Sequence, residues 1–354
     1  MRGHAQEAPR QTLETAGKSR LRVVFMGSDS FSLPSLETCL AQADVVAVYT
    51  QPDRRSGRGR KRLTRSPVAE LARRFGLHLE QPEAFDKRCL EQLRGFEADL
   101  IVVVAYGQIL PPPALRAARM EGINVHASLL PRHRGAAPIA AAILAGDAEA
   151  GVTIMKLRPR LDAGEIICYG ERRRRAQKAT PIRDGETSGQ LSARLAAIGG
   201  ELLADILRAF ADGSVTYEVQ DETQATTAPM LQKSDGRIDW SRPADRVARH
   251  IRAMTPWPGA YSELHLPGRE PIRVIVLRAR TSDQDADQDA AGRPGRIGRV
   301  EGPRLVVSTG ARCIELLEVK PAGRGPMNAA DFLRGSSAVR PGPEPDGGPW
   351  FADA

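Results

Sequence analysis

The 354-residue chain is short of cysteine, of aromatic residues and of long apolar stretches. Its cysteines, Cys39, Cys89, Cys168 and Cys313, stand far apart with no CxxC spacing, which argues against both a zinc site and a disulfide framework. We therefore expect no metal and a reducing, cytoplasmic setting. The longest apolar run, residues 100–106, is far too short to span a bilayer, so we expect no membrane partner.

Two nucleotide-binding fingerprints are also absent. The turn after the first predicted strand reads GSDSFSLP (27–34), which is not the GxGxxG pattern of dinucleotide-binding domains. No GxxxxGK[ST] occurs either. The sequence therefore offers no motif for NAD or for a nucleoside triphosphate.

Positive charge is present in excess, with 51 Lys and Arg residues against 43 Asp and Glu and a formal net charge of +8. A basic balance favours anionic partners, of which nucleic acid is the obvious candidate, although many arginine-rich proteins are simply basic. Residues 1–20 contain no apolar stretch, so they are not a secretory signal. We expect them to form a disordered leader.

Apolar, β-branched runs alternate with helical patterns throughout residues 21–213. The predicted strands are 21–27, 44–50, 98–107, 122–128, 151–157 and 164–170. The predicted helices are 32–43, 66–76, 85–96, 138–146 and 190–211. Strands with nearly continuous apolar character are typical of sheets buried on both faces. The alternation predicts an α/β domain with a parallel, Rossmann-like sheet.

The pattern changes after Gly213. Residues 214–235 are polar and predict a linker. Residues 236–335 hold one helical pattern and several short strands with turn residues between them, which predicts a smaller, OB-like β-barrel domain. The acidic insert 282–292 and the Pro- and Gly-rich tail 336–354 are predicted to be disordered.

Three polar side chains could meet at one edge of the predicted sheet. Asn124 and His126 stand one residue apart where a strand ends, so both point the same way. Ligands of open α/β sheets bind at that edge. Asp162 lies in the turn Leu161-Asp-Ala-Gly164 between two predicted strands. Each residue also has an ordinary interpretation, as a turn asparagine, a structural histidine and a plain Asp-x-Gly turn.

This set suits attack of a neutral amine on an acyl carbon. The asparagine amide and a protonated histidine can both donate to the oxyanion that forms, and the carboxylate can hold the imidazolium and relay protons. No GxSxG motif occurs, which favours direct transfer over a covalent intermediate.

The segment INVHASLLPRHRGAAP (123–138) closely resembles the signature of the folate-dependent formyltransferases. The similarity extends over about residues 21–334 and is to the methionyl-tRNA formyltransferases within that family. The similar stretches are QPDRRSGRGRK (51–61), SPVAELA (66–72), VVVAYGQILP (102–111), AGVTIMKL (150–157), VQDETQATTAPML (219–231), IDW (238–240) and IRAMTPWPGA (251–260).

This resemblance implies an enzyme of translation initiation. It would transfer the formyl group of its co-substrate 10-formyltetrahydrofolate to the α-amino group of initiator methionyl-tRNA. Residues 21–213 would be the formyltransferase catalytic domain, and residues 236–335 a tRNA-binding barrel. We expect a monomer.

The resemblance also assigns roles to particular residues. Asn124, His126 and Asp162 match the catalytic residues of the family. The segment associated with the folate is matched by Ser128, Leu129, Leu130 and Pro131, whose apolar side chains could contact the pterin while backbone groups bond its polar edge.

The sequence departs from the family pattern at three places. His133 stands where the family usually has Trp, and GSDSF (27–31) replaces Gly-Thr-Pro-x-Phe. The acidic residue usual shortly before the Leu-Asp-x-Gly turn is missing, and Arg158 and Arg160 make this edge basic. None of these changes falls on the three catalytic positions.

A basic loop, DRRSGRGRKRLTR (53–65), follows the second predicted strand, and seven of its thirteen residues are Arg or Lys. Such a run is usually a solvated surface feature. The resemblance makes it the loop that meets the tRNA acceptor end, because Arg grips phosphate and stacks on bases. The predicted tRNA-binding residues are Arg54, Arg55, Arg58, Arg60, Lys61 and Arg62. The run 172–175 is a weaker candidate.

Two other functions stay open at this point. The first is a formyltransferase for another amine, such as a sugar nucleotide or a glycinamide. The second is a non-catalytic RNA-binding protein on a degenerate transferase fold. The basic loop and the barrel disfavour the first, because a small substrate needs neither, and the intact catalytic set disfavours the second.

Overall fold

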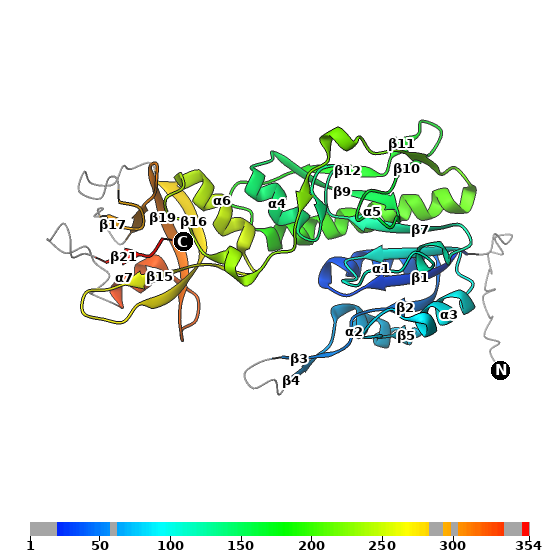
Figure 1. Ribbon diagram of the computed structural model, residues 1–354, viewed down its shortest axis with the longest axis horizontal. Helices are drawn as coiled ribbons and strands as arrows, with labels where there is room; N and C mark the ends of the chain where they lie inside the picture. The colour runs from blue at the N-terminus through cyan, green and yellow to red at the C-terminus, as the bar shows by residue number, and fades with distance from the viewer. Residues whose placement is uncertain (1–19, 57–61, 283–292, 299–303, 336–348, 354) are drawn as a thin grey trace, which may run out of the picture.

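The computed structural model describes residues 20–56, 62–282, 293–298, 304–335 and 349–353 (Figure 1). The first domain is built on a ten-stranded sheet with the order β11-β10-β9-β7-β6-β1-β2-β5, where β12 pairs with β9 and β13 pairs with β10. The strands are β1 (Arg22–Gly27), β2 (Asp44–Tyr49), β5 (Leu79–Glu80), β6 (Leu100–Val104), β7 (Glu121–His126), β9 (Glu149–Lys156), β10 (Ile166–Tyr169), β11 (Arg174–Arg175), β12 (Gln177–Pro181) and β13 (Thr216–Glu218).

The prediction of a parallel sheet is right for one half of this sheet and wrong for the other. β5, β2, β1, β6 and β7 are parallel neighbours. β9 pairs antiparallel with β7, from Ile123↔Lys156 to His126↔Thr153, and β10 and β12 are antiparallel to β9. The connection from β7 to β9 stays at one edge of the sheet, so β9 starts at the edge where β7 ends. Both halves have continuous apolar strands, so the apolar pattern does not distinguish them.

Two apolar clusters cover the two faces of the sheet. Alternate residues of β1 face opposite sides, with Val23 and Phe25 in one cluster and Val24 and Met26 in the other. The first cluster is closed by α1 (Leu33–Gln42), α2 (Pro67–Arg74) and α5 (Ser188–Asp212), and the second by α3 (Lys87–Gly95) and the 3-10 turn η3 (Ala114–Arg116). The Rossmann-like α/β domain is therefore confirmed, with a mixed sheet.

The segment 214–235 is more than the predicted linker. β13 pairs with β10, and β14 (Thr227–Ala228) pairs in parallel with the short strand β8 (Arg134–Gly135). Between them lies the 3-10 turn η4 (Glu222–Gln224), and η5 (Lys233–Gly236) leads into the second domain. The polar composition of this segment reflects hydrogen bonding to the first domain.

The second domain is a nearly closed antiparallel β-barrel, as predicted. Its strands follow the order β17-β18-β19-β16-β15-β21, and a bridge between Arg296 and Trp350 brings the two ends of the sheet together. The elements are α6 (Ala244–Met254), β15 (Ala260–His265), β16 (Ile272–Ser282), β17 (Ile297–Gly298), β18 (Leu305–Ser308), β19 (Cys313–Pro321), β20 (Met327–Asn328), α7 (Ala329–Arg334) and β21 (Trp350–Phe351). In Figure 1, α6 lies on the side of the barrel that faces the first domain, next to α4 (Pro138–Ala145).

The prediction that residues 336–354 are disordered is wrong for Trp350 and Phe351, which form β21. β21 pairs with β15, and Phe351 is fully buried with its ring 5.4 Å from that of Trp240. The aromatic pair supplies an apolar anchor that the surrounding Pro- and Gly-rich composition hides. Residues 1–19, 283–292 and 336–348 lie outside the described residues, and so do the predictions made for them. No helix in the described ranges is long and apolar enough to cross a membrane.

Candidate active site

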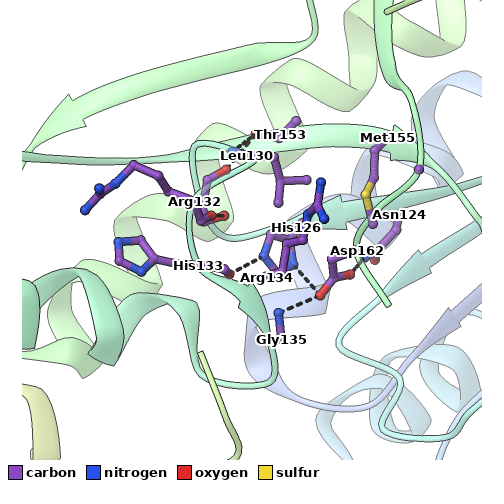
Figure 2. Close-up of polar contacts among 12 residues, drawn as sticks. Asn124, His126, Leu130, Arg132, His133, Arg134, Gly135, Thr153, Met155 and Asp162 are labelled. Atoms are coloured by element: carbon purple, nitrogen blue, oxygen red, sulfur yellow. Dashed lines mark hydrogen bonds and ion pairs between the residues drawn. The ribbon is translucent and has the colours of Figure 1, made fainter. Parts of the chain in front are cut away.

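Asn124, His126 and Asp162 are in contact at the edge of the sheet where β7 ends (Figure 2). The Asn124 amide nitrogen donates to Asp162 Oδ1 at 3.2 Å, and His126 Nδ1 lies 3.5 Å from Asp162 Oδ2. The side chains of His126 and Asp162 are 6% and 7% exposed. The three residues predicted to be catalytic are therefore brought together, with the His–Asp pair largely removed from water.

A backbone carbonyl fixes the orientation of the His126 ring. His126 Nε2 lies 3.0 Å from the carbonyl oxygen of His133. Because a carbonyl only accepts, this nitrogen carries a hydrogen, and Nδ1 is the atom directed at Asp162. His133 itself has a left-handed backbone, with φ of 57°, and its N–H donates to Thr226 Oγ1 at 2.9 Å.

The Asp162 carboxylate is fixed from three sides. Besides Asn124 and His126, the backbone N–H of Gly135 donates to Asp162 Oδ2 at 2.9 Å. Asp162 also has a left-handed backbone, with φ of 49°, in the turn between β9 and β10. Gly164 completes this turn, and a Cβ there would lie 1.8 Å from the carbonyl oxygen of Lys156. The glycine is therefore required for the turn to pack against β9.

The side chain at position 133 makes a contact that a tryptophan could not make in the same way. His133 is buried, and its Nε2 lies 2.7 Å from Asp147 Oδ2, while Arg132 donates to Asp147 Oδ1 at 2.7 Å. Burial alone raises the pKa of the Asp147 carboxyl, but the hydrogen bonds from His133 and Arg132, with the attraction of their charges, lower it overall. The cluster attaches the loop that follows β7 to the end of α4.

The segment expected to bind folate is only partly open to a ligand. Leu130 is buried against Met155 and Ile166, its N–H donates to Thr153 Oγ1 at 3.1 Å, and its carbonyl accepts from Gln177 at 2.9 Å. Ser128 is buried and donates to the carbonyl of Arg132 at 2.6 Å. The apolar surface that a pterin could contact on this segment comes from the half-buried Leu129 and Pro131. Folate binding by these four residues stays a prediction.

The basic loop forms a hairpin that projects from the first domain (Figure 1). β3 (Arg54–Ser56) pairs antiparallel with β4 (Arg62–Thr64), and Arg54 is exposed with a hydrogen bond to Gln51 Oε1 at 2.8 Å. Arg58, Arg60 and Lys61 lie outside the described residues. Arg55 and Arg62 are on the paired strands. Contact of this hairpin with tRNA stays a prediction.

The weaker basic candidate, 172–175, is partly engaged by the protein itself. The guanidinium of Arg174 lies 4.8 Å from the centre of the Tyr169 ring, and Arg175 forms an ion pair with Glu218.

The part of the chain that the structure describes holds no group of three or more His, Cys, Asp and Glu side chains that could bind a metal ion.

Several residues that support the site are not among those predicted from the sequence. They are Gly135, Asp147, Gln220 and Thr226, all of which contact either Asp162 or His133. Gln220 and Thr226 fall within VQDETQATTAPML, a stretch already singled out for its resemblance to the methionyl-tRNA formyltransferases. That stretch was the available signal for a role near the site.

Comparison with known proteins agrees with this geometry. Residues 21–207 match the formyl transferase family, and residues 230–337 match its C-terminal domain. The chain is 43% identical over 317 residues to methionyl-tRNA formyltransferase of Methylococcus capsulatus, covering 88% of this chain and 96% of that protein. The chain belongs to the methionyl-tRNA formyltransferase family. The same name is carried by a relative from Halorhodospira halophila, 43% identical over 324 residues, 90% of this chain and 97% of that protein.

Solved structures of more distant enzymes share the fold of this family member. An N-formyltransferase from Helicobacter canadensis, in complex with folinic acid and dTDP-3-aminofucose, has a TM-score of 0.58 at 14% identity, covering 84% of this chain and 98% of that one. HypX from Aquifex aeolicus in complex with tetrahydrofolic acid has a TM-score of 0.57 at 17% identity, covering 89% of this chain and 47% of that one. At these identities the likeness shows the fold alone.

Proposed function

We propose that the enzyme transfers the formyl group of 10-formyltetrahydrofolate to the α-amino group of initiator methionyl-tRNA at the edge formed by Asn124, His126 and Asp162. The observation that carries the proposal is the direct contact of a half-buried amide with a carboxylate that also contacts a buried imidazole. A member of this family needs oxyanion donors and a proton acceptor beside each other, and this cluster supplies both.

The geometry assigns a different role in the reaction to each of the three residues. The Asn124 amide nitrogen carries two hydrogens, of which one is donated to Asp162, so the second is available for the oxyanion. The 3.5 Å separation between His126 Nδ1 and Asp162 Oδ2 is longer than a good hydrogen bond. A proton on Nδ1 is therefore only weakly held by Asp162 and can also be donated to a reacting oxygen or nitrogen that lies beside the pair.

The proposed reaction is a direct displacement. The neutral amine attacks the formyl carbon and forms the new C–N bond, and Asn124 and His126 stabilise the oxyanion. The proton lost by the amine passes by way of Asp162 and His126 toward N10 of the folate. The C–N10 bond then breaks, which leaves tetrahydrofolate and formylmethionyl-tRNA. Holding the two substrates at one edge supplies much of the acceleration.

A groove beside the site supports a macromolecular acceptor. It has a volume of about 770 Å³ and is lined from the first domain by residues between 29 and 37, by residues 136–140 and by residues between 188 and 196 of α5. From the second domain it is lined by Pro256 and Trp257. Its lining starts next to Gly135, which donates to Asp162, and the Trp257 side chain is 52% exposed. We propose that the aminoacyl end of the tRNA reaches Asp162 along this groove, between the two domains.

The second candidate is a formyltransferase for a small amine such as an amino-sugar nucleotide. A small acceptor would make no use of the second domain or of the β3–β4 hairpin. We also propose that the enzyme is a monomer and that it acts in the cytoplasm. Sedimentation equilibrium, which measures the mass of the protein in solution, would test whether the enzyme is a monomer.

Acceptor choice tests the proposed function. The protein is incubated with 10-formyltetrahydrofolate and either Met-tRNA, free methionine or an amino-sugar nucleotide, and the products are analysed by mass spectrometry. Formylated Met-tRNA, without formylated methionine or sugar, is the expected result. A formylated sugar nucleotide would move the enzyme to the second class, and the absence of all three products would leave it without transferase activity.

A further inference from the structure

Gln220 lies in the segment that joins the two domains, and its side-chain amide is hydrogen-bonded to the turn that carries Asp162. It is 5% exposed, and its Nε2 donates to the carbonyl oxygens of Asp162 at 2.9 Å and Gly164 at 2.6 Å and also lies 3.8 Å from Met155 Sδ. Its Oε1 accepts from Arg134 Nε at 3.1 Å and Nη2 at 2.8 Å. An amide has two N–H donors and two acceptor lone pairs, so every one of them is used. The orientation of this side chain is therefore fixed.

The two bonds from Nε2 hold the turn that carries the proposed catalytic carboxylate. Asp162 has a left-handed backbone, which a residue with a side chain keeps only when its surroundings enforce it. Gln220 bonds the carbonyl of this same residue and that of Gly164, two positions further on. The backbone direction of Asp162 sets where its carboxylate points. Gln220 thus fixes the direction of the Asp162 carboxylate toward His126, although it contacts neither that carboxylate nor the imidazole ring.

The two bonds to Oε1 hold the other side of the same site. Arg134 is buried, and besides Gln220 it donates to both carboxylate oxygens of Glu222, at 3.1 Å and 2.9 Å. Arg134 directly precedes Gly135, whose N–H donates to Asp162 Oδ2. Gln220 therefore supports both partners of the Gly135–Asp162 hydrogen bond, one through Arg134 and the other through the turn.

We propose that Gln220 is a positioning residue for formyl transfer, which fixes Asp162 against His126 from the segment between the domains. The inference rests on the proposed function, in which Asp162 acts with His126. It also gives the joining segment a part in the active site, so that displacement of this segment would change the rate of transfer rather than the affinity for folate.

Two variants of Gln220 and one matched control test the proposal. Gln220→Met keeps the length of the side chain and removes its hydrogen bonds to Asp162, Gly164 and Arg134. Gln220→Glu keeps an acceptor for Arg134 and replaces the two N–H donors by a carboxylate that faces two carbonyls. The control, Gln224→Met, alters an exposed residue of the same segment, whose amide bonds only Asp221 among the residues that the structure describes.

We expect both Gln220 variants to lower kcat by about 10- to 100-fold, because a displacement of about 1 Å has an effect of this size. KM for both substrates should stay within about threefold, since the side chain serves the transition state. In an Asp162→Ala background, Gln220→Met should add little further loss, because the two residues act through one group. A kcat close to wild type in both Gln220 variants, or full additivity with Asp162→Ala, would overturn the proposal.

A spectroscopic measurement separates this proposal from the proposed function. With ¹⁵N-labelled histidine, the ring signals of His126 are assigned among the six histidines by their loss in His126→Ala. They should shift or broaden in both Gln220 variants and stay unchanged in Gln224→Met. Unchanged His126 signals in folded Gln220 variants would overturn the positioning role. A wild-type protein that formylates no acceptor would defeat the proposed function, while the ring signals would still decide the role of Gln220.

Discussion

The end of β7 and the β3–β4 hairpin are the two parts of the molecule predicted to meet the substrates, and they are built in opposite ways. At the end of β7, His126 and Asp162 are buried, and both side chains are held in place by hydrogen bonds to the backbone. On the hairpin, Arg54 is exposed, and among the residues that the structure describes its guanidinium bonds the side chain of Gln51, three residues away. Chemistry requires donors that are held in place before the substrate arrives, whereas attraction of a polyanion requires only charge within reach.

The largest expected effect comes from the catalytic edge. Asn124→Ala and His126→Ala should each lower kcat by at least about 100-fold, because each removes a donor to the oxyanion. Affinity for the folate should stay within several-fold, since both residues act on the transition state. Steady-state kinetics with Met-tRNA, together with folate binding measured by calorimetry, would check this. Turnover near wild type in either variant would remove that residue from the catalytic set.

Asp162 is expected to act through His126. Asp162→Asn should lower kcat severely, by an amount approaching about 100-fold, because an amide cannot stabilise an imidazolium as a carboxylate does. The double variant Asp162→Asn with His126→Ala should be little worse than His126→Ala alone. If instead the two losses multiply in full, the residues act independently and the 3.5 Å contact between them has no catalytic meaning.

The hairpin should affect binding more than chemistry. Neutralising Arg54, Arg55, Arg58, Arg60, Lys61 and Arg62 should raise KM for Met-tRNA without altering folate binding. Each lost phosphate contact should flatten the slope of log K against log salt by roughly 0.7–0.9. If the hairpin also positions the 3′ end of the tRNA, kcat should fall too, since misplacement by about 1 Å has an effect of roughly 100-fold.

The control for the hairpin is a short aminoacyl acceptor fragment, measured at the same series of salt concentrations. A solvated charge run would give only a small loss of affinity that disappears at high salt. An unchanged KM and salt slope for both substrates would make the hairpin a surface feature and assign tRNA recognition to the barrel.

The pH dependence should be set by the attacking amine. The value of kcat/KM should fall on the acid side, because protonated amine cannot attack the formyl carbon. Free α-amino groups titrate at about 7.7–8.0, and esterification of the carboxyl group lowers this further. The check is a pH profile under conditions where chemistry is shown to limit the rate. A flat profile over that range would contradict attack by a neutral amine.

The smallest expected effect concerns the His133–Asp147 pair, which holds the catalytic loop but not the reacting groups. Asp147→Ala should lower the free energy of unfolding by about 1.5–3 kcal/mol at neutral pH, as for hydrogen bonds to a charged group. The pKa of Asp147 is lowered in the folded protein, so its contribution is present above the pKa of the unfolded chain and is lost as the pH falls through the folded value. Urea denaturation of both proteins at neutral and at acid pH should show the difference disappearing. A difference that persists unchanged at acid pH would rule out the ionised carboxylate as its source.

The same contrast explains what the sequence could and could not predict. Asn124 and His126 could be placed together because residues two apart in a strand share a face, and Asp162 because its turn resembles that of a known family. The reversal of β9 was missed because an apolar run does not record strand direction. Phe351 was missed because the apolar anchor is a single aromatic pair within a stretch of polar, Pro- and Gly-rich composition.

Gln220 shows the limit most clearly. Nothing in a glutamine within a polar segment indicates that its amide will bond two carbonyls 58 and 56 residues earlier in the chain. Such contacts depend on tertiary placement. The polar pattern indicated only that the segment is not an apolar strand or helix, and this led to the expectation of a linker.

A rapid-quench, single-turnover experiment tests the central claim most directly. Enzyme saturated with 10-formyltetrahydrofolate labelled in the formyl group is mixed with Met-tRNA, quenched at successive times and separated into folate, protein and tRNA. The account predicts that label passes from folate to Met-tRNA without appearing on the protein, and that His126→Ala slows this step without changing its course. Label that accumulates on the protein before it reaches the tRNA, or that never reaches the tRNA, would contradict direct transfer at this site.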